Sequence, residues 1–240
     1  MKLDVLVFAA HPDDAELNAG GTIAALVTQG KKVGIIDLTK GEMGTRGDEE
    51  TRQNEVDKSS KILGIAYRDN LDLGDSVIDN SRDNQIKLIE QIRLTQPEIC
   101  IVGASYDRHP DHGKAAQLSI DSIFYSGLQK LVTQHNRVNQ SPWRPSSIFQ
   151  YMQDRPFEPD FISDITDYWV KKRDAILAFD TQFNVSDNSE ETETYISSST
   201  YFVQIESRAR YFGHLAGFQM GEPFKKINGP IGVKSILDIT

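Results

Sequence analysis

The sequence predicts an α/β fold, with a Rossmann-like, mostly parallel sheet, helices on both faces of that sheet, and a C-terminal α/β elaboration. In the first half of the chain, apolar runs too short for helices alternate with longer amphipathic segments. The short runs are rich in Val, Ile and Leu without polar alternation, which is typical of strands buried on both faces. Strands that alternate with helices in this way need crossover connections, and these build a parallel sheet covered by helices.

The elements of the first half follow in order. Strands are expected at residues 3–10, 32–39, 66–73 and 98–103. Helices are expected at residues 15–29, 49–63, 84–95 and 111 to about 132. Gly30 and Gly64 stand where helix ends favour glycine. Gly20 and Gly21 weaken the first helix and indicate a close approach of its backbone to another part of the molecule.

The second half is less regular. Strands are expected at residues 146–152 and 161–165, and helices at 167–179 and 203–213. The polar residues 184–200 are expected to form a mobile surface loop. No repeat or linker divides the chain, so we expect one domain over residues 1–240, with a core at about 3–132 and the elaboration at about 140–240.

Composition excludes several classes of protein. The 240 residues carry 26 Lys and Arg against 35 Asp and Glu, a net charge of −9, which argues against nucleic acid as a partner. The single cysteine, Cys100, excludes an internal disulfide and a thiolate zinc site. The sequence contains no long apolar run that could span a membrane, and its first residues do not resemble a signal peptide, so a soluble, cytoplasmic protein is expected.

Ligands of parallel sheets sit beyond the C-terminal ends of the strands, which here selects the loops at residues 11–16, 40–52 and 105–112. Two of these loops have nearly the same sequence. They are His11-Pro12-Asp13-Asp14 and His109-Pro110-Asp111-His112.

Neutral imidazole and carboxylate are the ligands that a catalytic zinc ion prefers. An aspartate before a helix is often only an N-cap, and Asp13, Asp14 and Asp111 all stand where caps stand. Two copies of the motif, each at a strand end, favour a metal site over capping. Of two adjacent aspartates, one can bind the metal and the other can act as a base, and spacing alone does not say which.

The motifs AHPDDAE, AGGT, TKGEMGTRG and DRHPDH together resemble those of the PIG-L/LmbE family of zinc-dependent deacetylases, over residues 3–131. Downstream, Trp143-Arg144, the sequence DTQF at 180–183, and Tyr201 with Glu206-Ser207-Arg208 are similar to the bacillithiol-biosynthesis subgroup. Enzymes of that subgroup deacetylate N-acetylglucosaminyl malate. The GEMGTRG loop is closer to the general family.

The resemblance implies roles for individual residues. The implied zinc ligands are His11, Asp14 and His112. Asp13 is implied as the general base and as the acid that protonates the leaving amine. His109, as an imidazolium, would stabilise the oxyanion, with Asp111 orienting it. Glu16 would support the first loop.

The resemblance implies substrate contacts as well. Arg52 and Arg46 are candidates for binding anionic or hydroxyl groups, although each could instead be a surface charge or pair with a nearby glutamate. Tyr201 is a candidate for helping the oxyanion, and core packing is its alternative. Arg144 is a candidate for reaching an active site, a neighbouring subunit's included, because the similar enzymes are trimers and hexamers.

Several alternatives stay open. The substrate could be another N-acetylglucosamine derivative or a thiol conjugate, and the fold could serve a non-catalytic sugar-binding module. A metal-dependent phosphoesterase also uses His and Asp clusters, often with two metals. One zinc ion per chain is the expected cofactor, and Fe²⁺, Co²⁺ or Mn²⁺ would also suit two histidines and an aspartate. The expected partners are a small amino sugar and further copies of this chain.

Overall fold

The computed structural model describes residues 1–183, 194–198 and 200–235, so most of the predicted 184–200 loop lies outside the described residues. Its main feature is a seven-stranded sheet in the order β3-β2-β1-β4-β7-β9-β8. The strands are β1 (Val5–Ala9), β2 (Val33–Asp37), β3 (Tyr67–Asn70), β4 (Ile99–Val102), β7 (Ser147–Tyr151), β8 (Phe161–Asp164) and β9 (Gly221–Lys226).

The sheet is parallel from β3 to β7, as predicted, and becomes antiparallel where β9 pairs with β7 and β8. The main helices are α1 (Asp14–Thr28), α2 (Glu49–Leu63), α3 (Arg82–Thr95), α4 (Pro110–Ser126), α5 (Trp169–Leu177) and α7 (Tyr201–Ala216). Two shorter ones are the 3₁₀ helix η1 (Thr166–Tyr168) and α6 (Asp180–Phe183).

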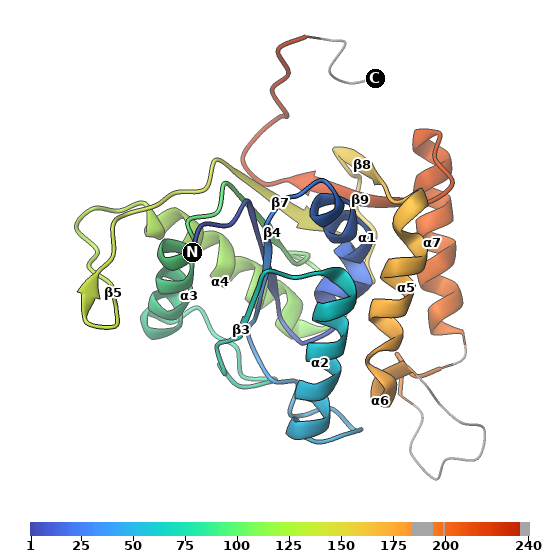
Figure 1. Cartoon of the computed structure of the whole chain (residues 1–240), viewed down its shortest axis with the longest axis horizontal. Helices are drawn as coiled ribbons and strands as arrows, with labels where there is room; N and C mark the ends of the chain where they lie inside the picture. Colours follow the sequence, from blue (N-terminus) through green and yellow to red (C-terminus); the bar gives the residue numbers. More distant parts are fainter. Residues whose placement is uncertain (184–193, 199, 236–240) are drawn as a thin grey trace.

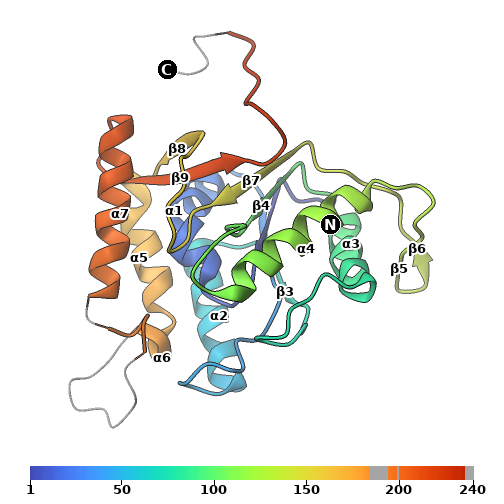
Figure 2. The same ribbon diagram turned by 180° about the vertical axis from the view of Figure 1, so that it is seen from behind.

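Helices cover both faces of the sheet (Figures 1 and 2). Side chains of β1 alternate between two cores, because successive residues of a strand point to opposite faces. Leu6 and Phe8 pack with residues of α3 and α4. Val5 and Val7 pack with residues of α1, α2 and α5. The α/β fold with a mostly parallel sheet is therefore confirmed.

The structure differs from the sequence predictions at the end of α4 and at β9. The expected helix to about residue 132 ends at Ser126, where Arg93 of α3 donates to the carbonyls of Ser126, Leu128 and Leu131 and so holds that stretch outside the helix. A small hairpin follows, made of β5 (Gln134–His135) and β6 (Val138–Asn139).

The second difference concerns β9, which was not predicted at all. Its sequence, GEPFKK, contains a glycine, a proline and three charges. Its first four residues are nevertheless buried. Glu222 tolerates burial there because it accepts hydrogen bonds from the N–H groups of Gly21 and Thr22 and pairs with Lys172 of α5.

The predicted close approach at the glycine pair of α1 is confirmed at Gly21. A Cβ atom there would lie 2.6 Å from the Cβ of Ile165. Gly21→Ala is therefore expected to destabilise the protein by about 1–3 kcal/mol, because the packed residues must move apart. Urea unfolding measures this cost. Gly232→Ala is the control, since a Cβ there meets no atom within 4 Å, and equal midpoints for the two variants would contradict the expectation.

No helix among the described residues is long and apolar enough to cross a membrane.

Candidate active site

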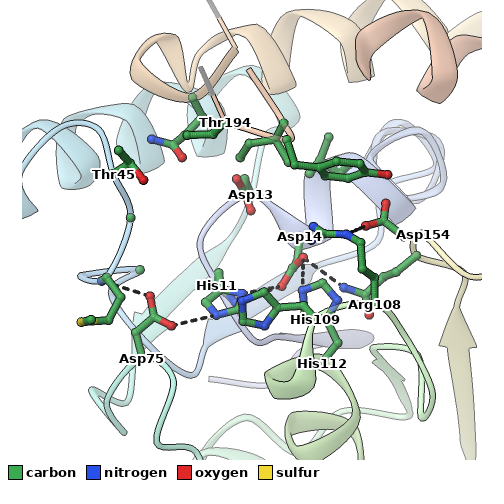
Figure 3. A pocket seen from close by; sticks show the side chains of 18 of the residues that line it. His11, Asp13, Asp14, Thr45, Asp75, Arg108, His109, His112, Asp154 and Thr194 are labelled. Atoms are coloured by element: carbon green, nitrogen blue, oxygen red, sulfur yellow. Dashed lines mark hydrogen bonds and ion pairs between the residues drawn. The ribbon is translucent and has the colours of Figure 1, made fainter. Parts of the chain in front are cut away.

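A cavity of about 270 Å³ opens at the C-terminal ends of the parallel strands. Loops that follow β1, β2, β3, β4 and β7 line it, together with α6, residues 194–196 and the first residue of α7. The location is the one that the strand-end rule selects. Figure 3 shows the rings of His11, His109 and His112 lying together next to Asp14 in this cavity.

His11, Asp14 and His112 converge around one point. The Nδ1 atom of His11 lies 3.5 Å from Oδ2 of Asp14, and Nε2 of His112 lies 3.3 Å from Oδ1 of the same carboxylate. The two imidazole centroids are 5.6 Å apart. Two ring nitrogens and one carboxylate that face one another in this way form a donor set suited to a divalent cation.

The far nitrogen of each ring is held by a further carboxylate. Oδ1 of Asp75 lies 3.2 Å from Nε2 of His11, and Oδ2 of Asp107 lies 2.6 Å from Nδ1 of His112. A carboxylate on the far nitrogen fixes the ring orientation and the tautomer of a metal-binding histidine. This arrangement leaves Nδ1 of His11 and Nε2 of His112 directed at Asp14.

The Asp14 carboxylate is held in its ionised form. Its oxygens accept hydrogen bonds from the backbone N–H of His11 and from Nε2 of Gln153, both at 3.0 Å. Burial alone would raise the pKa of Asp14, but the neighbouring His112 and His11 outweigh burial and hold that pKa well below its usual range. The group is thus an anion ready to bind a cation.

Asp13 differs from its neighbour in both backbone and environment. Its φ of 123° is a conformation that L-residues rarely adopt, and strain of this kind is concentrated at functional sites. Burial, and then the charge of Asp14, raise the pKa of Asp13 to about 8. Asp13 occupies the N-cap position of α1, but its side chain makes no capping hydrogen bond to the helix.

His109 and Asp111 are close together, but their contact differs from the expected one. Nδ1 of His109 accepts a hydrogen bond from the backbone N–H of Asp111. The Asp111 carboxylate instead accepts from the N–H of Ser76 and lies 3.7 Å from Nε2 of His11. Burial, and then the nearby His11 and His112, lower the pKa of His109, and the imidazolium role of this residue stays a prediction.

A second set of donors lies beside the first. Donor atoms of His11, Asp75 and Asp111 all lie within 4.8 Å of one another, as do those of His11, His109 and His112. Each set shares His11 with the predicted triad. The position of a bound ion therefore distinguishes the predicted triad from these two sets.

Arg52 lines the cavity, as predicted, from α2. Its guanidinium is buried beneath the loop that follows β1, where Nη1 donates to the carbonyl of Pro12 at 3.5 Å. Nε lies 3.4 Å from Oε2 of Glu55, so the ion pair considered as an alternative also forms. Oε1 and Oε2 of Glu55 in turn accept from the N–H and hydroxyl of Thr181 at the start of α6. Arg52 thus reaches the cavity while held on one side by Glu55.

The remaining predicted residues fall in different places. Tyr201 is buried, lines the cavity and stacks against Phe183. Arg46 is buried but is not among the lining residues, and its carbonyl accepts from Nε2 of Gln182. Glu16 pairs with Arg68 of β3 at 2.6 Å and accepts from the hydroxyl of Ser59 of α2, and its support of the first loop stays a prediction.

Arg144 lies away from this cavity. Its guanidinium covers the ring of Phe124 and donates to the Phe124 carbonyl, near the C-terminal end of α4. The cavity residues lie at the opposite end of that helix, at His109 and His112. Contact with the site of a neighbouring subunit stays a prediction for Arg144.

Sequence reasoning missed Asp75, Asp107 and Gln153. Asp107 stands two residues before the second His-Pro-Asp motif, so its proximity to His112 could have been suspected. Asp75 and Gln153 follow β3 and β7, and the strand-end rule would have selected them if it had been applied to those strands too.

Asp107→Asn is expected to weaken zinc binding by about 10- to 100-fold, because the amide no longer holds the ring of His112 through an ionic hydrogen bond. Competition with a chromogenic chelator measures the affinity. Asp160→Asn is the control, since the Asp160 carboxylate accepts from the N–H of Lys226, the last residue of β9. Unchanged affinity in Asp107→Asn would show that the 2.6 Å contact does not tune the site.

Comparison with known proteins places the chain in a family. The family model described as PIG-L, GlcNAc-PI de-N-acetylase, matches residues 6–123. The crystal structure of a conserved protein from Thermus thermophilus superposes with a TM-score of 0.85 at 33% identity, covering 97% of this chain and 98% of that one. The chain belongs to the PIG-L family.

Two relatives of this chain are named for different reactions. The diacetylchitobiose deacetylase of Thermococcus kodakarensis is 28% identical over 94% of this chain and 83% of its own length. The 4-oxalmesaconate hydratase of Pseudomonas putida is 26% identical over 71% of this chain and 70% of its own length. The relatives that this chain resembles therefore include a hydratase as well as a deacetylase.

Proposed function

We propose that this PIG-L protein is a metal-dependent deacetylase that removes the N-acetyl group from an N-acetylglucosamine-type sugar. The observation that carries the proposal is the meeting of His11, Asp14 and His112 in one cavity, with the buried carboxyl of Asp13 next to them in the chain. Amide hydrolysis needs an activated water, a stabilised oxyanion and a proton for the leaving nitrogen. The cavity contains a candidate for each task.

The donor set fits a divalent cation, with zinc as the first choice. His11 and His112 would bind it through Nδ1 and Nε2, the nitrogens that their carboxylate partners leave available, and Asp14 through its carboxylate. When bound, the cation supplies a Lewis acid that polarises the acetyl carbonyl and lowers the pKa of a water. Fe²⁺, Co²⁺ and Mn²⁺ suit the same donors.

Asp13 is the proposed base and acid. In its ionised form this carboxyl has a strong affinity for a proton, because burial and the charge of Asp14 raise its pKa. It takes a proton from the attacking water as the water oxygen bonds to the carbonyl carbon. It then gives that proton to the amide nitrogen as the C–N bond breaks, which releases acetate and the free amine.

Two side chains are proposed to face the oxyanion. His109 lies with its ring centroid 4.8 Å from that of His11 and presents the nitrogen that the Asp111 N–H does not contact. Burial, and then the charge of Asp154, raise the pKa of Tyr201 well above its usual range, so its hydroxyl stays protonated and able to donate. Hydrogen-bond donors directed at developing charge are a large source of rate enhancement.

The sugar and its substituent are proposed to extend from this centre toward Arg52, and Arg46 is the second proposed contact. Arg52 presents a guanidinium fork able to hold a carboxylate or a pair of hydroxyls. N-acetylglucosaminyl malate would place a carboxylate on the Arg52 guanidinium, and it is our specific substrate proposal, with a role in bacillithiol biosynthesis. Diacetylchitobiose, the substrate named for the Thermococcus relative, is neutral and would use the hydroxyl contacts alone.

We also propose that residues 1–240 fold as one domain and assemble into a trimer or hexamer. The seven-stranded sheet supports the one-domain proposal, because β7, β8 and β9 extend the same sheet as β1 to β4. Sedimentation velocity measures the oligomeric state. A monomer at micromolar concentration would contradict it.

The testing experiment measures acetate release by the zinc-loaded protein from N-acetylglucosaminyl malate, diacetylchitobiose, N-acetylglucosamine and an acetylated thiol conjugate. We expect release from the sugars, with the highest kcat/KM for the malate conjugate. Equal values for the malate conjugate and the neutral sugars would contradict the specific substrate. Absence of acetate release from all four compounds would contradict deacetylation. Parallel assays for hydration of an unsaturated dicarboxylate and for phosphate-ester cleavage would then test whether the protein is a hydratase or a phosphoesterase.

A further inference from the structure

Two amide side chains contact the proposed metal ligand Asp14. Nδ2 of Asn18, one turn along α1, donates to the Asp14 carbonyl at 2.8 Å. Nε2 of Gln153, just beyond β7, donates to Oδ1 of the Asp14 carboxylate at 3.0 Å. The Gln153 amide cannot turn freely, because its Oε1 accepts from the N–H of Ala104 at 2.9 Å. The two contacts hold both the backbone and the carboxylate of this ligand.

A single guanidinium joins these two groups. Arg208, on α7, donates from Nη2 to Oδ1 of Asn18 at 2.8 Å and from Nη1 to the backbone carbonyl of Gln153. The planar fork of arginine presents donors in a fixed geometry, so one side chain can set the spacing of two acceptors on different elements. Here the spacing is that between α1 and the end of β7.

The placement of Arg208 is costly if it serves packing alone. Its burial lowers the pKa of the guanidinium. Within the described residues, Arg208 forms no ion pair with a carboxylate at 4.0 Å or less, unlike Arg210 on the same helix, which pairs with Glu206 at 2.7 Å. A desolvated cation without a close counter-ion is destabilising. A methionine would fill the space without that cost.

We propose that Arg208 is a positioning residue for the metal site, which fixes the Asp14 carboxylate through Gln153 and Asn18. The inference rests on the proposed metal site and deepens it. Arg208 and Gln153 both lie outside residues 6–123, the part of the chain that matches the family model. The geometry of a ligand in the family motif is thus set from the C-terminal part of the chain.

The test compares zinc affinities of the full chain by chelator competition. Arg208→Gln is expected to bind zinc about 10- to 100-fold more weakly, the usual cost of losing a group that orients a ligand. Arg208→Lys keeps the charge but cannot bridge both acceptors, so its affinity is expected to fall as well. Arg210→Gln is the matched control on the exposed side of α7, and we expect wild-type affinity.

Two further measurements distinguish the proposed positioning role of Arg208 from a purely structural role. The visible spectrum of the Co²⁺-loaded protein reports ligand geometry, and it is expected to change in Arg208→Gln and not in Arg210→Gln. The effects of Arg208→Gln and Gln153→Ala on zinc affinity are expected to be less than additive, because both act through one carboxylate. If Arg208→Gln does not fold, Asn18→Ala tests the same path and is expected to bind zinc several-fold more weakly.

The outcomes separate the two proposals. If the wild-type chain binds no zinc, the proposed function fails. If the wild-type chain binds zinc and Arg208→Gln has the same affinity and the same Co²⁺ spectrum, the positioning role is overturned and the proposed function stands. Wild-type zinc affinity in Arg208→Lys would show that the two-armed guanidinium is not required. Unchanged zinc affinity in Asn18→Ala would show that Arg208 does not act on Asp14 through Asn18.

Discussion

Asp13→Asn is expected to lower kcat by about 10²- to 10⁴-fold, the usual contribution of a general acid–base group, while zinc binding is retained. The amide has nearly the shape of the carboxyl but cannot take a proton from water or return one to the leaving nitrogen. The proposed ligands His11, Asp14 and His112 are unchanged, so the metal content of the purified protein is expected to stay at the wild-type level. Acetate release and metal analysis on the same preparation measure both quantities.

The backbone at Asp13 supplies the control for that experiment. Because its φ is 123°, Asp13→Gly relieves strain at the same position while also removing the carboxyl. Both variants are expected to lose activity, and Asp13→Gly, which alone relieves the backbone strain, is expected to be the more stable of the two. Wild-type turnover in either variant would show that Asp13 is not the base.

Asp14→Ala is expected to abolish stabilisation of the protein by zinc. A ligand at 100 times its Kd stabilises a folded protein by about 2.7 kcal/mol, and this gain should be present in the wild type and absent in the variant. Thermal unfolding with and without zinc measures it. Zinc stabilisation is lost because the variant keeps the two imidazoles but has no anion between them. In the wild type, the Asp14 carboxylate lies 3.5 Å from Nδ1 of His11 and 3.3 Å from Nε2 of His112.

Asp154→Ala is the matched control for Asp14→Ala. Asp154 lines the same cavity, but it pairs with Arg108 at 2.8 Å and is not part of the triad. The control variant is expected to keep its zinc stabilisation. Equal loss in both variants would mean that the negative charge of the cavity, and not the triad, attracts the ion.

The central part of the fold could be predicted from the sequence because its strands are apolar on both faces. The β1 sequence, VLVFA, is buried at every position and contains no polar residue. The β9 strand could not be predicted, since its burial depends on partners far away in the chain. Glu222 is stabilised there by Lys172 and by N–H groups of α1, and none of these contacts has a local signal.

The candidate site also has residues that could be predicted from the sequence and contacts that could not. The residues that converge on Asp14 could be predicted because each follows a strand of the parallel sheet in a repeated motif. Their supporting contacts could not, because they depend on side-chain orientation. The Asp111 carboxylate faces His11 and Ser76 and leaves His109 with a backbone contact, and no spacing rule distinguishes these arrangements.

The position of the bound ion tests the account most directly. Crystals of the zinc-loaded protein, measured on both sides of the zinc absorption edge, give an anomalous difference peak where zinc is bound. We expect one peak per chain, bounded by Nδ1 of His11, the Asp14 carboxylate and Nε2 of His112. A peak between His11, Asp75 and Asp111, where donor atoms also lie within 4.8 Å of one another, or no peak in this cavity, would contradict the account.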